Sequence, residues 1–246
     1  SNANGNYIGF VDSDDFIQPQ MYEFLYRAII ENKCDFSVCR YIKTTELIEK
    51  KFDYKTEKFI PENFVSFNDS EFTINNELVF SAIWTKLISK EFLKNIKFNN
   101  FRIGEDTVFN SQLCSKDYKA VFVDAELYNY YINTQSVSFT ELWHEKWFDL
   151  LETRFISYDL LKNKNKILAA FYLERGMKFL LSYRFNLKGS PNENKFKNPI
   201  KKYFKKYYMP FMKCENISLK NKISVPIFFL FPFFYNKFRK MTDKTL

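Results

Sequence analysis

Glycine and histidine are scarce in this sequence, and its cysteines are widely spaced. The 246 residues include five glycines, one histidine (His144) and four cysteines, Cys34, Cys39, Cys114 and Cys214. Because no Cys-x-x-Cys pair is present, the ligands of a structural zinc site are missing. Wide cysteine spacing is typical of reduced thiols in the cytoplasm. These absences exclude a zinc module and predict a cytoplasmic protein with free thiols.

Acidic side chains are nearly absent from the C-terminal part of the chain. Between Lys195 and Lys240 there are twelve Lys or Arg residues and one acidic residue, Glu215. This stretch carries a charge of +11, whereas the whole chain carries +8, so the remainder is slightly acidic. The asymmetry predicts two functional regions. Because no nucleic-acid-binding motif accompanies the positive charge, we do not expect a nucleic-acid partner.

Apolar residues make up 46% of the chain, enough to bury a sizeable core. Up to about residue 132, strand-like apolar runs alternate with helical patterns, which predicts an α/β fold with a mostly parallel sheet. A helix from Pro19 to about Asn32 is expected to bury one apolar face. That face consists of Met21, Phe24, Leu25, Ala28 and Ile29. A further helix is predicted over residues 77–83.

The pattern changes after Thr140, where helical periodicity dominates. Helices are predicted over residues 141–162, 167–186 and 194–212. The sequence therefore predicts two regions, an α/β domain over residues 4–139 and a helical C-terminal region over residues 140–246.

An acidic sequence follows the first predicted strand. The apolar run Tyr7–Val11 is expected to end at Asp12-Ser13-Asp14-Asp15. In open α/β sheets, ligands bind beyond the carboxyl ends of strands. Crowded carboxylates repel one another unless a cation neutralises them, and Mg²⁺ or Mn²⁺ suits carboxylate oxygens that share substrate phosphates. Asp12, Asp14 and Asp15 are therefore candidate ligands. The alternative is a solvated turn that caps the next helix.

A second acidic element, Gly104-Glu105-Asp106, lies almost a hundred residues downstream. A carboxylate that faces the same crevice can take a proton from an attacking hydroxyl group. The alternative is that both acidic residues complement the positive end of the helix predicted from Asp106 to Ser115.

Together the two elements resemble a known family. The segment GNYIGFVDSDDFIQPQMYEFLY is similar to the metal-binding strand, loop and helix of family-2 glycosyltransferases, which have a GT-A-type fold. The segment SAIWTKLISKEFLKNIKFNNFRIGEDTVFN resembles a later block of that family, in which an aromatic-x-Lys-Leu sequence precedes a catalytic Glu-Asp. LYNYYINTQSVS resembles the strand and loop that follow. The resemblance covers about Gly5 to Ser138.

The resemblance implies a role for each matching residue. Asp14 would be the direct metal ligand, and Asp12 would lie near the donor ribose and the metal-bound phosphates. Asp106 would be the general base, and Glu105 would shape the acceptor side. Trp84 would stack on a sugar face, with a position in the core as the alternative. The donor would be a nucleotide sugar, and a divalent cation would stabilise the departing nucleoside diphosphate in a single inverting displacement.

The match lacks the first strands of the family's sheet, which hold the nucleotide base. The resemblance therefore implies a truncated GT-A-type domain with little transfer activity by itself. The strand at Tyr7, which would be interior in the whole sheet, is expected to leave an unpaired edge. A homo-oligomer or another cover over that edge is predicted.

The tail contains an apolar, aromatic segment, Val225–Tyr235, between lysines. It is shorter than the ~20 residues that span a bilayer, and Pro226 and Pro232 are expected to interrupt a regular helix. One hypothesis is peripheral contact of residues 220–240 with the inner face of the cell membrane. The alternative is that this segment docks on the helical region.

The main functional hypothesis is a metal-dependent, inverting glycosyltransferase of cell-envelope or capsular polysaccharide synthesis. Its acceptor would be a saccharide or a lipid-linked saccharide. The first alternative is a non-catalytic membrane-surface or protein-interaction module that retains a remnant of the fold. The second alternative makes the acidic loop a plain cation site.

Overall fold

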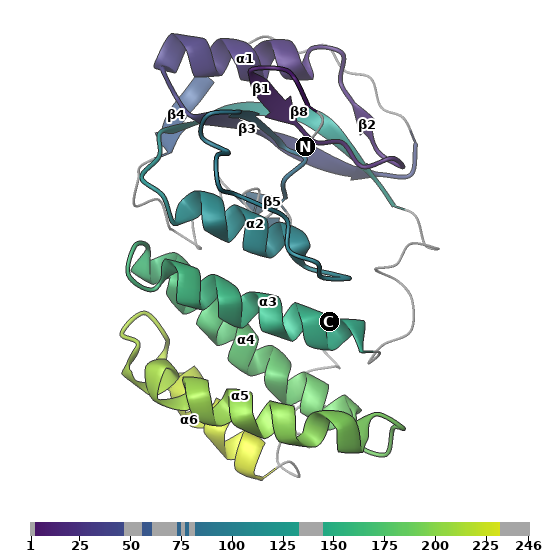
Figure 1. The fold of residues 1–246 in the computed structure, drawn as a ribbon, viewed down its shortest axis with the longest axis vertical. Coiled ribbons are helices and arrows are strands. Elements are labelled where there is room, and N and C mark those ends of the chain that lie inside the picture. The colour runs from purple at the N-terminus through teal and green to yellow at the C-terminus, as the bar shows by residue number, and fades with distance from the viewer. Residues whose placement is uncertain are drawn as a thin grey trace. The chain divides into compact units, whose positions relative to one another are not determined.

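The computed structural model describes residues 3–46, 56–60, 73–74, 77–78, 82–132 and 145–231 (Figure 1). The chain divides into two compact units. The sheet unit comprises Ser1–Asn99 and Asp106–Thr140, and the helical unit comprises Asn100–Glu105 and Glu141–Leu246. The last break lies next to the boundary expected from the sequence. The short segment Asn100–Glu105 joins the helical unit, which the sequence does not predict.

The sheet unit is built on six strands with the order β1-β7-β3-β8-β2, and β4 pairs with β8 off this path. The strands are β1 (Tyr7–Gly9), β2 (Phe16–Ile17), β3 (Phe36–Thr44), β4 (Thr56–Ile60), β7 (Lys86–Ser89) and β8 (Ala120–Tyr131). A separate antiparallel pair is formed by β5 (Thr73–Ile74) and β6 (Glu77–Leu78).

The predicted α/β class is confirmed, but the sheet is mixed rather than mostly parallel. Among the described pairings of this sheet, β3–β8 is parallel and the other four are antiparallel. β1, β3 and β8 therefore run in one direction, with β7 reversed between β1 and β3. A parallel neighbour needs a long crossover, usually a helix, whereas an antiparallel neighbour does not. The helix predicted over residues 77–83 is wrong, because Glu77–Leu78 forms β6 and residues 83–85 lie in bends and turns.

Helices cover both faces of this sheet. Figure 1 shows α1 (Met21–Asn32) on one face and α2 (Glu105–Cys114) on the other. The predicted apolar face of α1 is confirmed, since all five of its residues are buried: Met21, Phe24, Leu25, Ala28 and Ile29. Burial of each large apolar side chain contributes about 1.5–3 kcal/mol. Through this face α1 packs on the sheet that carries the acidic loop.

The helical unit contains α3 (Lys146–Leu161), α4 (Lys166–Asn186), α5 (Glu193–Lys213) and α6 (Leu219–Leu230). The three predicted helices are confirmed as α3, α4 and α5. α4 contacts each of the other three helices, and a core of aliphatic and aromatic side chains lies between them. In that core the ring of Phe155 stacks on Tyr207 with centroids 4.1 Å apart. The helical C-terminal region is therefore a packed body with its own core.

The helix α6 corrects the sequence prediction for the tail. Pro226 lies inside α6 and does not interrupt it, because Val225 and Phe229 are buried and hold the helix in place. The Ser218 side chain caps the start by accepting a hydrogen bond from the Asn221 N–H at 3.3 Å. Pro232 lies outside the described residues. Within the described part of the chain, no helix has both the length and the apolar character needed to cross a membrane.

The four cysteines are free thiols, as predicted. Cys34, Cys39 and Cys114 are buried, and Cys214 is half-buried. Burial raises the pKa of Cys39 and of Cys114 to about 12. These two thiols therefore remain protonated at neutral pH and behave as small apolar side chains.

Candidate active site

The acidic loop follows β1 directly. Its carboxylates at Asp12 and Asp14 are exposed, and Asp15 is half-buried. The loop closes on itself through a hydrogen bond from the Asp15 N–H to the Asp12 carbonyl oxygen at 3.1 Å. Upstream, a Cβ atom at Gly9 would lie 2.4 Å from the Tyr22 ring, so only glycine fits there. The chain thus leaves the sheet tightly against α1 and presents two carboxylates outward.

Three hydrogen bonds tie this loop to β8. The Tyr128 hydroxyl donates to Asp15 Oδ2 at 2.7 Å, and the Tyr131 N–H donates to Asp15 Oδ1 at 2.8 Å. The Asp12 N–H donates to the Tyr128 hydroxyl oxygen at 3.1 Å. We call this arrangement the Tyr128 clamp. Because both Asp15 oxygens accept from β8, we assign Asp15 to positioning the loop and keep Asp12 and Asp14 as candidate ligands.

Electrostatics support the clamp. The pKa of Asp15 is raised, chiefly by burial and to a smaller extent by the charge of Asp14. The hydrogen bonds from Tyr128 and Tyr131 offset part of that rise. Burial and the bond to Asp15 raise the pKa of Tyr128 far above its ordinary value. Tyr128 therefore keeps its proton and acts as a donor across the accessible pH range.

Trp84 supports the clamp from behind. Its side chain is only 8% exposed, and its ring stacks on Tyr128 with centroids 4.2 Å apart. It also meets the Tyr41 ring edge-on at 4.8 Å. These contacts favour the core position over the sugar-stacking position. In this arrangement Trp84 holds the ring of Tyr128, which in turn holds the loop.

Two residues beyond Trp84, Lys86 is fully buried, which the sequence does not predict as a separate feature. Its Nζ donates to the Ala82 carbonyl oxygen. Burial lowers the pKa of Lys86 to about 8, and the charges of Cys114 and Asp106 offset part of that shift. The Asp106 carboxylate therefore lies within electrostatic reach of a buried ammonium group. The available signal was a charged residue inside the mainly apolar run Ala82–Ile88, in which Thr85 is the one other polar residue.

Glu105 and Asp106 open α2, and both are half-buried. Gly104, just before them, has φ +84°, and a Cβ atom there would lie 2.8 Å from Thr153 Oγ1. Both the backbone conformation and the space therefore require glycine. The division between the two units falls between Glu105 and Asp106.

A bidentate ion pair fixes the segment that carries Glu105. Arg102 Nε and Nη2 donate to the two Asp149 oxygens at 2.7 and 2.8 Å. The Arg102 N–H donates to Asp149 Oδ2 at 3.1 Å. The hydrogen bond from the Arg102 side chain lowers the pKa of Asp149. Glu105 is thus held within the helical unit by a neighbouring charge pair.

An aromatic contact within the sheet unit links the segments next to Asp12 and Asp106. Phe10, two residues before Asp12, meets Phe109 at a centroid distance of 5.8 Å. Phe109 lies one helical turn after Asp106 on α2. The structure therefore joins the segments that precede Asp12 and follow Asp106. A cavity shared by the Asp14 and Asp106 carboxylates stays a prediction.

The carboxylates of the acidic loop suit a cation that is coordinated partly by the protein and partly by a substrate. In the described residues, no group of three or more His, Cys, Asp or Glu side chains is placed to hold a metal ion. Mg²⁺, however, is commonly held by one or two carboxylates together with substrate phosphates and water. The exposed carboxylates of Asp12 and Asp14 fit that arrangement and do not fit a cage made only of protein ligands.

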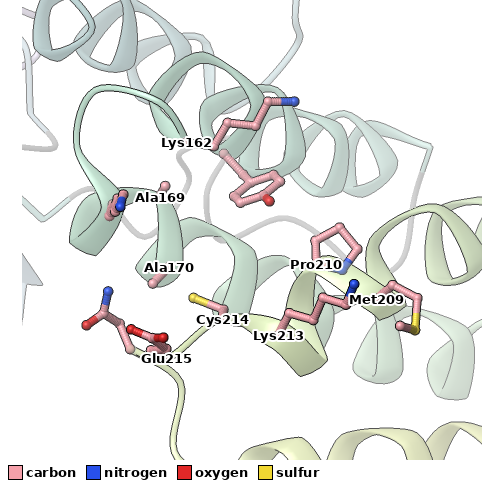
Figure 2. A pocket seen from close by; sticks show the side chains of 11 residues that line it. Lys162, Ala169, Ala170, Met209, Pro210, Lys213, Cys214 and Glu215 are labelled. Carbon is pink, nitrogen blue, oxygen red and sulfur yellow. The ribbon is translucent and has the colours of Figure 1, made fainter.

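The helical unit has a separate cavity of about 520 Å³ (Figure 2). It lies where ends of α3, α4 and α5 meet, and Lys162, Lys213 and Cys214 are part of its lining. None of the predicted site residues lines this cavity. Asp159 accepts a hydrogen bond from Lys162 at 2.9 Å, which balances part of the positive charge. We assign no chemistry to it.

Comparisons with known proteins give named relatives but no family model. No protein-family model matches the chain. A 157-residue stretch is 30% identical to Glycosyltransferase GlyA of Streptococcus pneumoniae serotype 4, covering 61% of this chain and 22% of GlyA. A 145-residue stretch is 28% identical to Glycosyltransferase GlyG of the same organism, covering 56% of this chain and 48% of GlyG. The chain thus spans less than half of either curated relative.

Solved structures of S. aureus TarS 1-349 resemble the fold. The complex of TarS with UDP has a TM-score of 0.56 at 16% identity, covering 92% of this chain and 62% of TarS 1-349. The complex with UDP-GlcNAc has a TM-score of 0.55 at 17% identity, covering 86% and 58%. At such low identity the likeness shows the fold alone. The sequence relatives are named glycosyltransferases, and the structural neighbour binds a nucleotide sugar.

Proposed function

We propose that this chain carries the metal-binding and acceptor-binding part of an inverting, family-2-type glycosyltransferase. The observation that carries the proposal is the Tyr128 clamp, which presents the carboxylates of Asp12 and Asp14 at the end of β1. The named relatives GlyA and GlyG support the reaction class. The TarS complexes support a nucleotide sugar as the donor.

In this proposal the chain binds the donor through its diphosphate. Asp14 and Asp12 would hold Mg²⁺ or Mn²⁺, which would supply positive charge for the departing nucleoside diphosphate. Asp15 and Tyr128 keep the two ligands in place without touching the donor. Trp84 acts through Tyr128 and not by stacking on a sugar.

Asp106 acts as the general base in the same proposal. The acceptor hydroxyl oxygen forms a bond to the anomeric carbon as the bond from that carbon to the diphosphate oxygen breaks. The hydroxyl proton passes to the Asp106 carboxylate, and the configuration at the anomeric carbon inverts. The buried ammonium group of Lys86 interacts electrostatically with this carboxylate. Glu105 shapes the acceptor side.

The pathway and the location belong to the same proposal. We place the acceptor among the saccharides or lipid-linked saccharides of the cell envelope or capsule. The site of action is then cytoplasmic, with the basic tail near the inner face of the membrane. The portion of the tail beyond residue 231 lies outside the described residues.

We also propose that this chain alone transfers little sugar. It spans 22% of GlyA and 48% of GlyG, so most of each relative lies outside the match. β1 is the last strand on its side of the described sheet. A hollow of about 1360 Å³ lies beside it, lined among others by Tyr7, Phe10 and Tyr26. Such an open edge favours a further segment or a second copy as its cover, and the mass of the chain in solution tests the second copy.

Calorimetry of nucleotide-sugar binding tests the proposal. We expect UDP-GlcNAc to bind in the presence of Mn²⁺ and not in its absence. Asp14→Ala should abolish the Mn²⁺-dependent heat, because it removes the direct ligand. Glu31→Ala, which changes an exposed carboxylate on α1, is the matched control and should leave binding unchanged.

The competing functions give different results in the same titration. Mn²⁺ binding that needs Asp14 but is indifferent to the nucleotide sugar would favour a plain cation site. Absence of both metal and nucleotide binding would favour a non-catalytic module that retains the fold.

A further inference from the structure

The orientation of α6 is fixed by contacts along one of its sides. Asn221 Nδ2 donates to Glu174 Oε1 at 2.8 Å. The Phe229 ring stacks on Phe204 with centroids 3.6 Å apart. The Arg184 guanidinium donates to the Phe229 carbonyl oxygen and lies 4.3 Å from the centre of its ring. The side that carries Asn221, Val225 and Phe229 therefore faces the helical core.

The opposite side of α6 is apolar and exposed. The exposed fractions are 72% for Leu219, 52% for Ile223, 41% for Ile227 and 65% for Leu230. At about 100° per residue these four side chains fall within an arc of about 80°. We call them the α6 stripe. A contiguous exposed apolar patch with polar borders marks an interaction surface, so the stripe indicates a partner surface.

The borders of the stripe are positively charged. Lys220 and Lys222 project on its two flanks when the same helical angles are applied. No aspartate or glutamate occurs between Asn216 and Phe231. The borders of the stripe are therefore basic.

This combination matches a membrane surface better than a second copy of the chain. An apolar helix side with lysines at its borders can insert into the boundary between headgroups and acyl chains, where anionic lipids attract the lysines. A second copy would bring the same positive charge against the first. With twelve residues, α6 is about 18 Å long and would lie in the plane of the surface.

We propose that the α6 stripe, with Lys220 and Lys222, docks the chain on an anionic lipid surface. The lipid-facing residues are Leu219, Ile223, Ile227 and Leu230, while Val225 and Phe229 belong to the core. This division separates the proposal from a general attraction by the basic tail. The proposal goes beyond sugar transfer and holds whether or not the acidic loop binds a donor.

Sedimentation with lipid vesicles tests the proposal. The chain is expected to bind vesicles of phosphatidylglycerol mixed with phosphatidylcholine and not vesicles of phosphatidylcholine alone. Added salt should weaken binding, because exposed charges are screened over about 10 Å at 0.1 M ionic strength. The double variant Ile223→Asn/Ile227→Asn should lose affinity by at least about tenfold, since two apolar side chains no longer leave water.

A matched control separates the stripe from general effects of an asparagine. Ile30 on α1 is 50% exposed, close to the 52% of Ile223, and lies in the sheet unit. Ile30→Asn should leave vesicle binding unchanged.

Lys220→Gln/Lys222→Gln should weaken binding to the anionic vesicles about tenfold or more. Because every substituted side chain is exposed or on the border, circular dichroism should show an unchanged fold. Leu219→Gln serves as a second stripe variant if the double variant fails to fold.

Three results would overturn the proposal. The first is equal vesicle binding by the stripe variants and Ile30→Asn. The second is no binding, or equal binding to neutral and anionic vesicles. The third is self-association of the unmodified chain, measured by light scattering, that Ile223→Asn/Ile227→Asn abolishes, because the stripe would then face another copy.

Discussion

The two units hold their polar groups in different ways. In the sheet unit, hydrogen bonds join residues far apart in sequence, as in the bond from Tyr128 to Asp15 across 113 positions. In the helical unit, hydrogen bonds between helices, such as the bond from Tyr203 to Glu152 across 51 positions, surround a core that includes the stacked rings of Phe155 and Tyr207. In the account proposed above, the sheet unit positions a few carboxylates, and the helical unit offers the α6 stripe.

The largest stability effect is expected in the aromatic core of the helical unit. Phe155 is fully buried, stacks on Tyr207, and lies 3.0 Å from the position a Cβ atom would take at Gly176. Phe155→Ala should lower the free energy of unfolding by about 3–5 kcal/mol, because it leaves a cavity. Urea unfolding followed by circular dichroism measures this. Ile167→Ala, at a side chain 40% exposed, is the control and should cost less than about 1 kcal/mol.

Lys86→Met should act in the opposite direction in the sheet unit. The folded-state pKa of Lys86 is lowered from 10.5 to about 8, so the folded chain binds fewer protons than the unfolded chain between these values. The free energy of unfolding should therefore rise with pH through this window. Replacement by Met should remove that rise and stabilise the protein at pH 7 by up to about 3 kcal/mol.

A comparison of the two chains is cleaner than the pH profile of either one. Burial raises the pKa of Cys39 and of Cys114 from 9.0 to about 12, so from about pH 8 upward these thiols lower the stability of both chains alike. A stability advantage of Lys86→Met over the unmodified chain that does not shrink from pH 8 to 9 would contradict the burial of a charged lysine.

Tyr128→Phe tests the clamp and should have the smallest effect on stability. Removing the hydroxyl leaves Asp15 Oδ2 and the Asp12 N–H without this partner, which costs about 1–3 kcal/mol. Mn²⁺-dependent binding of UDP-GlcNAc should weaken as the loop loosens. Tyr131→Phe is the matched control, because Tyr131 holds Asp15 through its backbone N–H. Equal binding by the two variants would show that the clamp does not position the ligands.

Sequence patterns predicted the helices whose buried side chains recur at helical spacing along one segment. The face of α1 followed from apolar residues at helical spacing, beginning at Met21 and ending at Ile29. The helices α3, α4 and α5 followed from the same periodicity, although Pro199 and Pro210 lie inside α5. Burial of Phe196, Ile200, Tyr207 and Phe211 outweighs the cost of the two prolines.

Features that depend on a distant partner were not predictable from local patterns. The direction of β7 is set by its pairing with β1 and β3, and the short strand β6 depends on β5. Pro226 stays helical because α6 docks through Phe229 on Phe204. The same limit applies to the site. The sequence marked Asp12, Asp14 and Asp15 alike, and only the bonds from Tyr128 and Tyr131 separate Asp15 from the other two.

A crystal structure of the chain with Mn²⁺ and UDP-GlcNAc tests the central claim most directly. We expect the anomalous signal of one Mn²⁺ beside Asp14, with the diphosphate bound to it and the Asp106 carboxylate facing the anomeric carbon in the same cavity. A metal ion bound away from Asp14 would contradict the account, as would Asp106 and Asp14 side chains on opposite faces of the sheet unit.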